Sequence, residues 1–309
     1  MSAPTPAPPV SPPLASAPRG FLGRLRAVLA MIAFPHTLFA LPFALFGTML
    51  AAREASPPGW PGGRTLLLIL GCMVTARSAA MAYNRLVDHR LDAANPRTAG
   101  RHLPAGLLGR AWVGGFVIAN AALFMGLATL LGPLAGRLSP LALAWTLGYS
   151  HAKRFTAASH FWLGLSLAIA PIGAWIAVRG TLASAPWLLA AAVLLWVAGF
   201  DLIYALQDAA FDRARGLHSL PVRLGAAGTL RLAALCHGGM LIALALLGVQ
   251  QGLGLPFRAG LLLAAILLIW EHRVVRGGDL ARIDLAFFRI NSWVGVLIFL
   301  TGGLAILLS

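Results

Sequence analysis

RSAAMAYNRLVDHRLDAANPRTAGRHLPAG, residues 77–106, lies where a long apolar segment gives way to a polar loop. Within it Asn84, Asp88 and Asp92 are spaced four residues apart, so on a helix they form one polar stripe. Two arginines follow in the loop. The chain has few acidic residues, and carboxylates near a membrane cost free energy, so such a stripe indicates a functional role. The pattern indicates a divalent metal ion that holds a phosphate ester.

The composition of the whole chain is that of a membrane protein. Of its 309 residues, 59% are hydrophobic and only 11% are charged, and the mean hydropathy is +0.81. A soluble domain of this length would not have these values. The apolar runs have the length of about 20 residues that a bilayer-spanning helix needs, and they are continuous rather than alternating, which excludes a β-barrel.

We expect an all-α membrane protein with nine transmembrane helices. The predicted spans, of which the fourth is the shortest, are 28–52, 65–88, 111–132, 138–151, 158–178, 183–206, 228–249, 257–275 and 289–308. Residues 1–18 are rich in Pro, Ala and Ser and are expected to form a disordered tail. Residues 19–309 are expected to form a single domain.

Basic residues alternate between the two sides of the predicted membrane domain. The N-terminal segment and the segments after the second, fourth, sixth and eighth spans are rich in arginine and lysine. The opposite segments carry only Arg53, Arg64, Arg137, Arg179 and Arg258. This asymmetry predicts a cytoplasmic N-terminus in a bacterial-type inner membrane, with the chemistry facing the cytoplasm. The same asymmetry explains the net charge of +15. We exclude nucleic-acid binding because no basic surface domain is present.

A second polar stripe follows the sixth predicted span, in DLIYALQDAAFDRARGLHS (201–219). Asp201, Tyr204, Asp208 and Asp212 recur there at helical spacing and predict one face. Carboxylates from two stripes that face each other would repel, and Mg²⁺ resolves this by sharing oxygen ligands with substrate phosphates. The alternative is that the aspartates only cap helices or pair with loop arginines, and two stripes of matched spacing argue against it.

At these residues the sequence resembles the UbiA superfamily of intramembrane prenyltransferases. The family's first motif, N-D-x-x-D-x-x-x-D, is matched except that Arg85 replaces an acidic residue, and its second, D-x-x-Y-x-x-x-D-x-x-x-D, is matched in full. The segments that resemble the family's conserved loops are Arg97-Thr98-Ala99, Arg101, Leu103-Pro104-Ala105-Gly106, Tyr149, Lys153-Arg154, Thr156 and Gly216-Leu217-His218-Ser219. His218 stands where the family usually has lysine.

The resemblance implies a nine-helix bundle around a central cavity, in which Mg²⁺ holds an isoprenyl diphosphate. The implied catalytic residues are Asp88, Asp92, Asp201, Asp208 and Asp212. The implied metal ligands are Asn84, Asp88, Asp92, Asp208 and Asp212. Diphosphate is expected to contact Arg97, Arg101, Lys153, Arg154 and Tyr204. An electron-rich aromatic ring would attack the allylic cation that is left when diphosphate departs.

The expected acceptor is a small aromatic acid in quinone biosynthesis. The residues 36–45, HTLFALPFAL, and the first motif look closest to a bacterial subgroup labelled 4-hydroxybenzoate polyprenyltransferase and associated with menaquinone made through futalosine, where the acceptor would be a dihydroxynaphthoate. Arg77 and Asn84 are the candidate acceptor-binding residues. Arg77 shares the first stripe two turns deeper and needs an anion. That anion is either the acceptor's carboxylate or a motif aspartate such as Asp201.

Other functions fit the pattern less well. A CDP-alcohol phosphotransferase would need its aspartates in a D-G-x-x-A-R context, which neither stripe has. An ion-coupled transporter would place its acids near the middle of the membrane, whereas most of these lie at span ends. Within the family, prenylation of haem or of a chlorophyll side chain differs only in the acceptor. His36 and Asn291, lone polar residues at spans one and nine, are expected to form interhelical hydrogen bonds.

Overall fold

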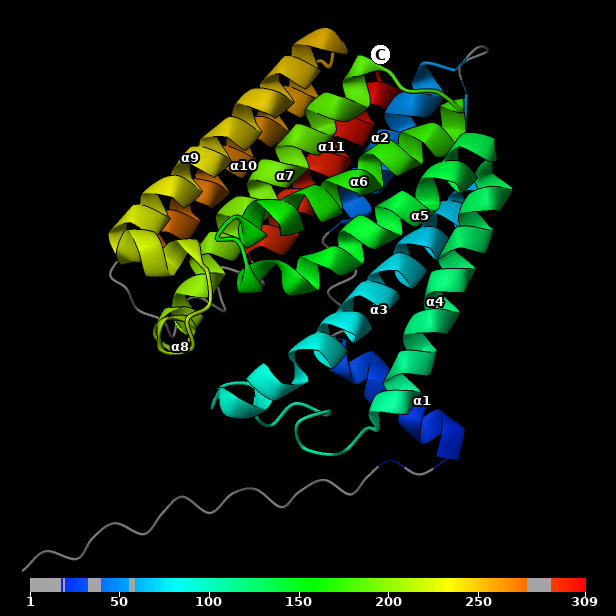
Figure 1. The fold of residues 1–309 in the computed structure, drawn as a ribbon. Helices are drawn as coiled ribbons and strands as arrows, with labels where there is room; N and C mark the ends of the chain where they lie inside the picture. Colours follow the sequence, from blue (N-terminus) through cyan, green and yellow to red (C-terminus); the bar gives the residue numbers. More distant parts are fainter. Residues whose placement is uncertain (1–17, 19, 33–39, 56–58, 277–289) are drawn as a thin grey trace, which may run out of the picture.

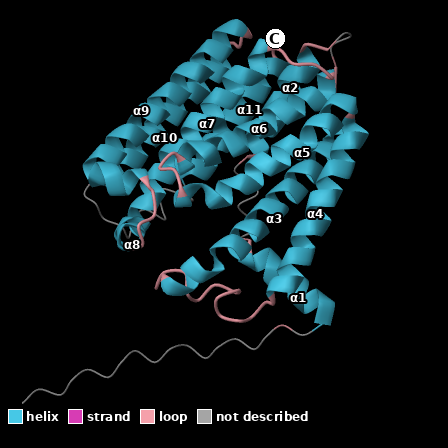
Figure 2. Ribbon diagram, viewed as in Figure 1, coloured by secondary structure: helices cyan, strands magenta, loops and turns pink. Residues whose placement is uncertain are grey.

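The computed structural model describes residues 18, 20–32, 40–55, 59–276 and 290–309. Every regular element in these residues is a helix (Figures 1 and 2). The predicted tail, apart from Pro18, and the prediction for His36 lie outside the described residues.

The bounds of the helices are as follows. In chain order they are α1 (Gly20–Met31), α2 (Leu41–Arg53), α3 (Gly63–Ala94), α4 (Arg110–Leu131), α5 (Pro133–Gly148), η2 (Tyr149–Arg154), α6 (Ser159–Arg179), α7 (Ser184–Tyr204), η3 (Ala205–Asp208), α8 (Ala209–Ala214), α9 (Leu220–Gln250), α10 (Leu255–Val275) and α11 (Asn291–Leu307).

Six of the helices formed by the described residues are long and apolar enough to cross a bilayer. They are α3, α4, α6, α9, α10 and the run Ser184–Ala214 that starts with α7, while α2 and α11 are shorter apolar helices. Large apolar side chains also face outward on these helices: Ile118 on α4 is 71% exposed and Leu235 on α9 is 73% exposed. Such surfaces are suited to contact with lipid.

The first predicted span is wrong. Instead of one helix over 28–52, the structure has α1, which ends at Met31, and α2, which begins at Leu41. Val28 of α1 packs in a separate apolar cluster with Ala82 of α3 and Val113 of α4, so α1 lies across the ends of α3 and α4 (Figure 1).

The main core lies between α2, α6, α7, α9, α10 and α11. α6 and α7 form an antiparallel pair in which Gly164 faces the backbone of Leu194 so closely that no side chain fits between them. Asn291 makes the interhelical hydrogen bonds that its sequence position predicted, because it donates to Glu271 (2.7 Å) and accepts from Trp196 (2.8 Å). These bonds join α7, α10 and α11 at one end of the bundle.

The two stripes lie on different kinds of helix end. The first is fully helical, because α3 continues to Ala94, beyond the predicted end of its span. The second is not one regular helical face as predicted, since α7 ends at Tyr204 and a 3₁₀ turn, η3, precedes α8. The change in helix type rotates the aspartates of the second stripe toward different partners.

Candidate active site

The first stripe is held by its own helix and by two nearby cations. Asn84 donates a hydrogen bond to Asp88 (3.0 Å), as their spacing of four residues allows. Arg154 of η2 pairs with Asp88 Oδ1 at 3.0 Å, and Arg101 of the loop pairs with Asp92 Oδ1 at 2.7 Å. The stripe therefore meets cations from both sides of α3.

Arg85, the residue that departs from the family pattern, lies against Asp92. Its Nη1 is 3.7 Å from Asp92 Oδ2, and its side chain is only 15% exposed. Asp92 Oδ2 is buried and accepts no hydrogen bond from any described residue. Arg85 therefore places a positive charge next to Asp92, and one oxygen of Asp92 retains free lone pairs.

The second stripe is joined to the loop that follows the first. Arg97 donates from Nε and Nη2 to the two oxygens of Asp208, at 3.0 and 2.6 Å, and from Nη1 to the hydroxyl of Tyr204 at 3.1 Å. Asn95 donates to Asp208 as well, at 3.1 Å. Partial burial alone would lower the pKa of Arg97, but the hydrogen bonds and charge of Asp208 outweigh burial and raise it.

The short helix η2 connects both stripes through neighbouring residues. Lys153 Nζ lies 3.4 Å from Asp212 Oδ2 of the second stripe, while Arg154 pairs with Asp88 of the first. The backbone N–H of His218 donates to the carbonyl of Lys153 (2.8 Å), so at this position the backbone makes a contact whatever the side chain. Asp88 pairs with Arg154 and Asp208 with Arg97, and the neighbouring residues Lys153 and Arg154 of η2 bring the two stripes to the same end of the molecule.

Asp201, the deepest aspartate, has a partner that the sequence pattern did not predict. His160, at the start of α6, is fully buried, and its Nδ1 lies 2.7 Å from Asp201 Oδ2. The contact follows from the helix pairing, because α6 and α7 are joined by a short turn near residue 181 and residues 160 and 201 lie opposite each other. Asn95 was not predicted either, although it lies inside the first quoted stretch.

Arg77, the candidate acceptor-binding residue, lies on α3 and is partly buried. It is not a free cation, because it already interacts within the protein. It is also close enough to Arg85 for the two positive charges to interact. This placement is compatible with either anion, the acceptor's carboxylate or a motif aspartate.

The residues present fit a magnesium ion that is shared with a phosphate group. Four carboxylates (Asp88, Asp92, Asp208 and Asp212) pair with five cations (Arg85, Arg97, Arg101, Lys153 and Arg154), while the fifth carboxylate, Asp201, pairs with His160. A diphosphate alone would therefore add uncompensated negative charge. Within the part of the chain that the structure describes, no three acidic, histidine or cysteine residues converge on one point. Mg²⁺ does not require this, since it usually takes one or two carboxylates, water and substrate phosphate.

The fold and this site define the chain as a multi-pass helical membrane protein with two carboxylate-bearing helix ends around a set of arginines. Comparison with known proteins agrees. Residues 40–293 match the model of the UbiA prenyltransferase family. The chain is 30% identical to 4-hydroxybenzoate octaprenyltransferase of Methylobacillus flagellatus over 255 aligned residues. The alignment covers 82% of this chain and 84% of that relative.

Solved structures are similar as well. The apo structure of a UbiA homolog from Aeropyrum pernix K1 has a TM-score of 0.75 and 32% sequence identity, covering 89% of this chain and 98% of that one. A UbiA homolog from Archaeoglobus fulgidus bound to DMAPP and Mg²⁺ shares the fold, with a TM-score of 0.63, 16% identity and coverage of 89% and 99%. This chain belongs to the UbiA prenyltransferase family and is an aromatic prenyltransferase.

Proposed function

We propose that this protein catalyses the Mg²⁺-dependent transfer of an isoprenyl group from a polyprenyl diphosphate to 4-hydroxybenzoate or a dihydroxynaphthoate in quinone biosynthesis. The name of the Methylobacillus relative supports 4-hydroxybenzoate. The structure of the Archaeoglobus fulgidus homolog bound to DMAPP and Mg²⁺ supports a prenyl diphosphate as the second substrate and Mg²⁺ as the metal. We further propose nine transmembrane helices in a bacterial inner membrane, a cytoplasmic N-terminus and a site facing the cytoplasm, as the arginine distribution predicts.

The observation that carries the proposal is the two-pronged contact of Arg97 with Asp208. It brings the loop after the first stripe into contact with the second stripe, so a ligand that binds Arg97 in this loop also lies beside the second stripe. A guanidinium that holds a carboxylate by two hydrogen bonds has the geometry to hold a phosphate in the same way.

In this proposal the cations exchange carboxylate oxygens for diphosphate oxygens when substrate binds. Arg97, Arg101, Lys153 and Arg154 then stabilise the leaving group, and the freed aspartates are available as metal ligands with Asn84. Mg²⁺, when bound, would neutralise the diphosphate and hold it in place. Tyr204, held by Arg97, contributes a hydroxyl at the same point.

The reaction breaks the allylic C–O bond, and its electron pair leaves with the diphosphate. A ring carbon of the acceptor then forms a C–C bond to the allylic carbon and afterwards loses its proton. In this proposal Arg77, on the deeper part of α3, holds the acceptor's carboxylate. The surrounding apolar helices exclude water that would otherwise capture the allylic cation.

The test is an assay of the purified protein in lipid vesicles with geranyl diphosphate, Mg²⁺ and a panel of aromatic acids. We expect a prenylated 4-hydroxybenzoate or dihydroxynaphthoate that is lost in Asp88→Ala and in Asp208→Ala. Glu54→Ala, which removes an acid from the opposite end of the helices, should keep activity. A product formed only with a haem or chlorophyllide acceptor would refute the proposed acceptor, and full activity of both aspartate variants would refute the site.

A further inference from the structure

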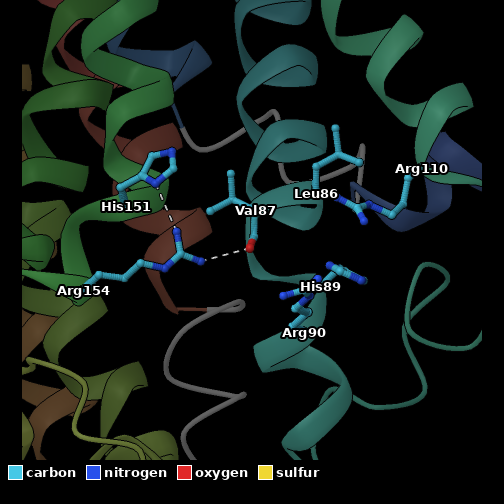
Figure 3. A pocket seen from close by; sticks show the side chains of 7 residues that line it. All are labelled: Leu86, Val87, His89, Arg90, Arg110, His151 and Arg154. Atoms are coloured by element: carbon cyan, nitrogen blue, oxygen red, sulfur yellow. Dashed lines mark hydrogen bonds between the residues drawn. The ribbon is translucent and has the colours of Figure 1, made fainter.

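A basic depression lies beside the carboxylate site, with which it shares Arg154, between the end of α3, the start of α4 and η2 (Figure 3). Its volume is about 440 Å³. The residues that line it are Leu86, Val87, His89, Arg90, Arg110, His151 and Arg154. None of them is acidic, so the depression presents three arginines and two histidines to whatever enters it.

Two of the lining residues are already engaged. Arg154 donates to the carbonyl of Val87 and to Asp88, and its Nη1 lies 3.1 Å from His151 Nδ1. Because arginine only donates, His151 accepts at Nδ1, carries its proton on Nε2 and donates to the hydroxyl of Tyr83 (3.0 Å). These two side chains form the inner wall of the depression and connect it to the first stripe.

The outer cations have no such partners. Arg90 and Arg110 are exposed, and neither makes a hydrogen bond or ion pair with another described residue. Arg110 is the first residue of α4, a helix of 22 residues, so the positive end of that helix lies at the rim. The proposed prenyl transfer uses neither arginine.

The depression is placed at the boundary of the membrane. α3 and α4 are both candidate spans, and the depression lies where α3 ends and α4 begins. Leu86 and Val87 form its apolar side, and the outer face of α4 carries exposed Ile118 and Leu123 farther along the helix. A ligand with a charged head and apolar chains would match both parts.

We propose that this depression binds the phosphate of an anionic phospholipid, which Arg90 and Arg110 hold while the acyl chains lie along α3 and α4. Basic pockets between membrane helices on the cytoplasmic side are suited to anionic headgroups. Guanidinium groups bind phosphate with two parallel hydrogen bonds. Free soluble phosphate would fit the charge but would leave the apolar side without a partner.

The test measures lipid binding and so does not depend on enzyme activity. The purified full chain is mixed with phosphatidylglycerol or phosphatidylcholine of the same acyl chains, and bound lipid is counted by native mass spectrometry. We expect the double variant Arg90→Gln/Arg110→Gln to bind phosphatidylglycerol about tenfold or more weakly, with phosphatidylcholine binding unchanged. Arg90→Lys/Arg110→Lys should retain part of the binding because the charge is kept.

The matched control is Arg213→Gln/Arg223→Gln, which removes two exposed arginines from the same end of the molecule on α8 and α9. It should bind phosphatidylglycerol as the parent protein does. If both double variants lost phosphatidylglycerol binding equally, the lipid would be held by diffuse attraction to charge, and the proposal would be overturned. Unchanged binding in Arg90→Gln/Arg110→Gln would overturn it as well. Displacement of phosphatidylglycerol by soluble glycerol phosphate at equal concentration would also overturn it, because the ligand would then be free phosphate.

Discussion

Arg97 joins the loop after the first stripe to the second stripe, because three of its nitrogen atoms donate hydrogen bonds, two to Asp208 and one to Tyr204. A lysine carries the same charge but cannot reproduce a planar fork. We therefore expect Arg97→Lys to raise the KM for the prenyl diphosphate by about tenfold or more. Steady-state kinetics with varied diphosphate measures this, with Arg213→Lys as control. An unchanged KM would show that Arg97 does not bind the diphosphate.

His160 is expected to hold Asp201 in place within the protein interior. His160→Ala removes the partner of a carboxylate that is only 16% exposed and leaves a cavity where a fully buried ring was. We expect a loss of about 2–4 kcal/mol in the free energy of unfolding, which lowers the melting temperature in detergent.

His160→Gln keeps a donor and part of the volume, and should recover part of that loss. If the alanine variant melts at the same temperature as the parent, the contact contributes nothing to stability. If the glutamine variant recovers nothing, a side-chain donor at this position is not enough to hold Asp201.

For single residues, the sequence predicts where the charged side chains lie along the chain, but it does not predict well which of them contact each other in the fold. The spacing of Asp88 and Asp92, and of Asp208 and Asp212, predicts two sets of carboxylates, and in the structure each of these residues pairs with a cation. The contact of Asp201 with His160 is different, because it joins residues on two helices and depends on how those helices face each other. A lone histidine near the start of a span carries no local signal of that contact.

At the scale of the helices, the close approach of α6 and α7 depends on Gly164. A methyl group at this position would overlap the backbone carbonyl oxygen of Leu194, which cannot move without the helix. We expect Gly164→Ala to lower the free energy of unfolding by about 1–3 kcal/mol and to reduce activity, because His160 lies on the same helix.

Gly173, also on α6, is the matched control, since a methyl group there meets no atom within 4 Å. Gly173→Ala should leave the melting temperature unchanged or raise it slightly, as alanine favours a helix. Equal melting temperatures for the two variants would show that α6 and α7 can separate at no cost.

The helices themselves follow from the apolar runs, and each of the nine predicted spans overlaps a helix of the described residues. The breaks between helices do not follow from the apolar runs. Composition alone cannot separate α1 from α2 within one apolar run, nor place the 3₁₀ turn η3 between Tyr204 and Asp208, because both depend on packing against neighbouring helices. Helix ends are accordingly predicted less well than helices.

At the scale of the whole molecule, charge and site share one end of the bundle. The ends of α3 and α7, the start of α9 and the helix η2 all meet there, and they carry the arginines and the carboxylates together. A basic segment resists translocation, so the arginines that we propose to bind the diphosphate are also expected to orient the chain in the membrane. The proposed substrate binding and the predicted orientation would then depend on the same arginines.

That link predicts the orientation of α3, which can be tested with a matched pair of cysteines. Gly59 and Gly100 are both exposed, lie beyond opposite ends of α3, and have open space around a new side chain. In a background without Cys72 and Cys236, a membrane-impermeant maleimide added to spheroplasts should label Gly59→Cys and not Gly100→Cys, because the arginine-rich end stays inside. Inside-out vesicles should give the opposite result. Labelling of Gly100→Cys in intact spheroplasts would place the carboxylate site outside the cell, away from a cytoplasmic supply of substrate.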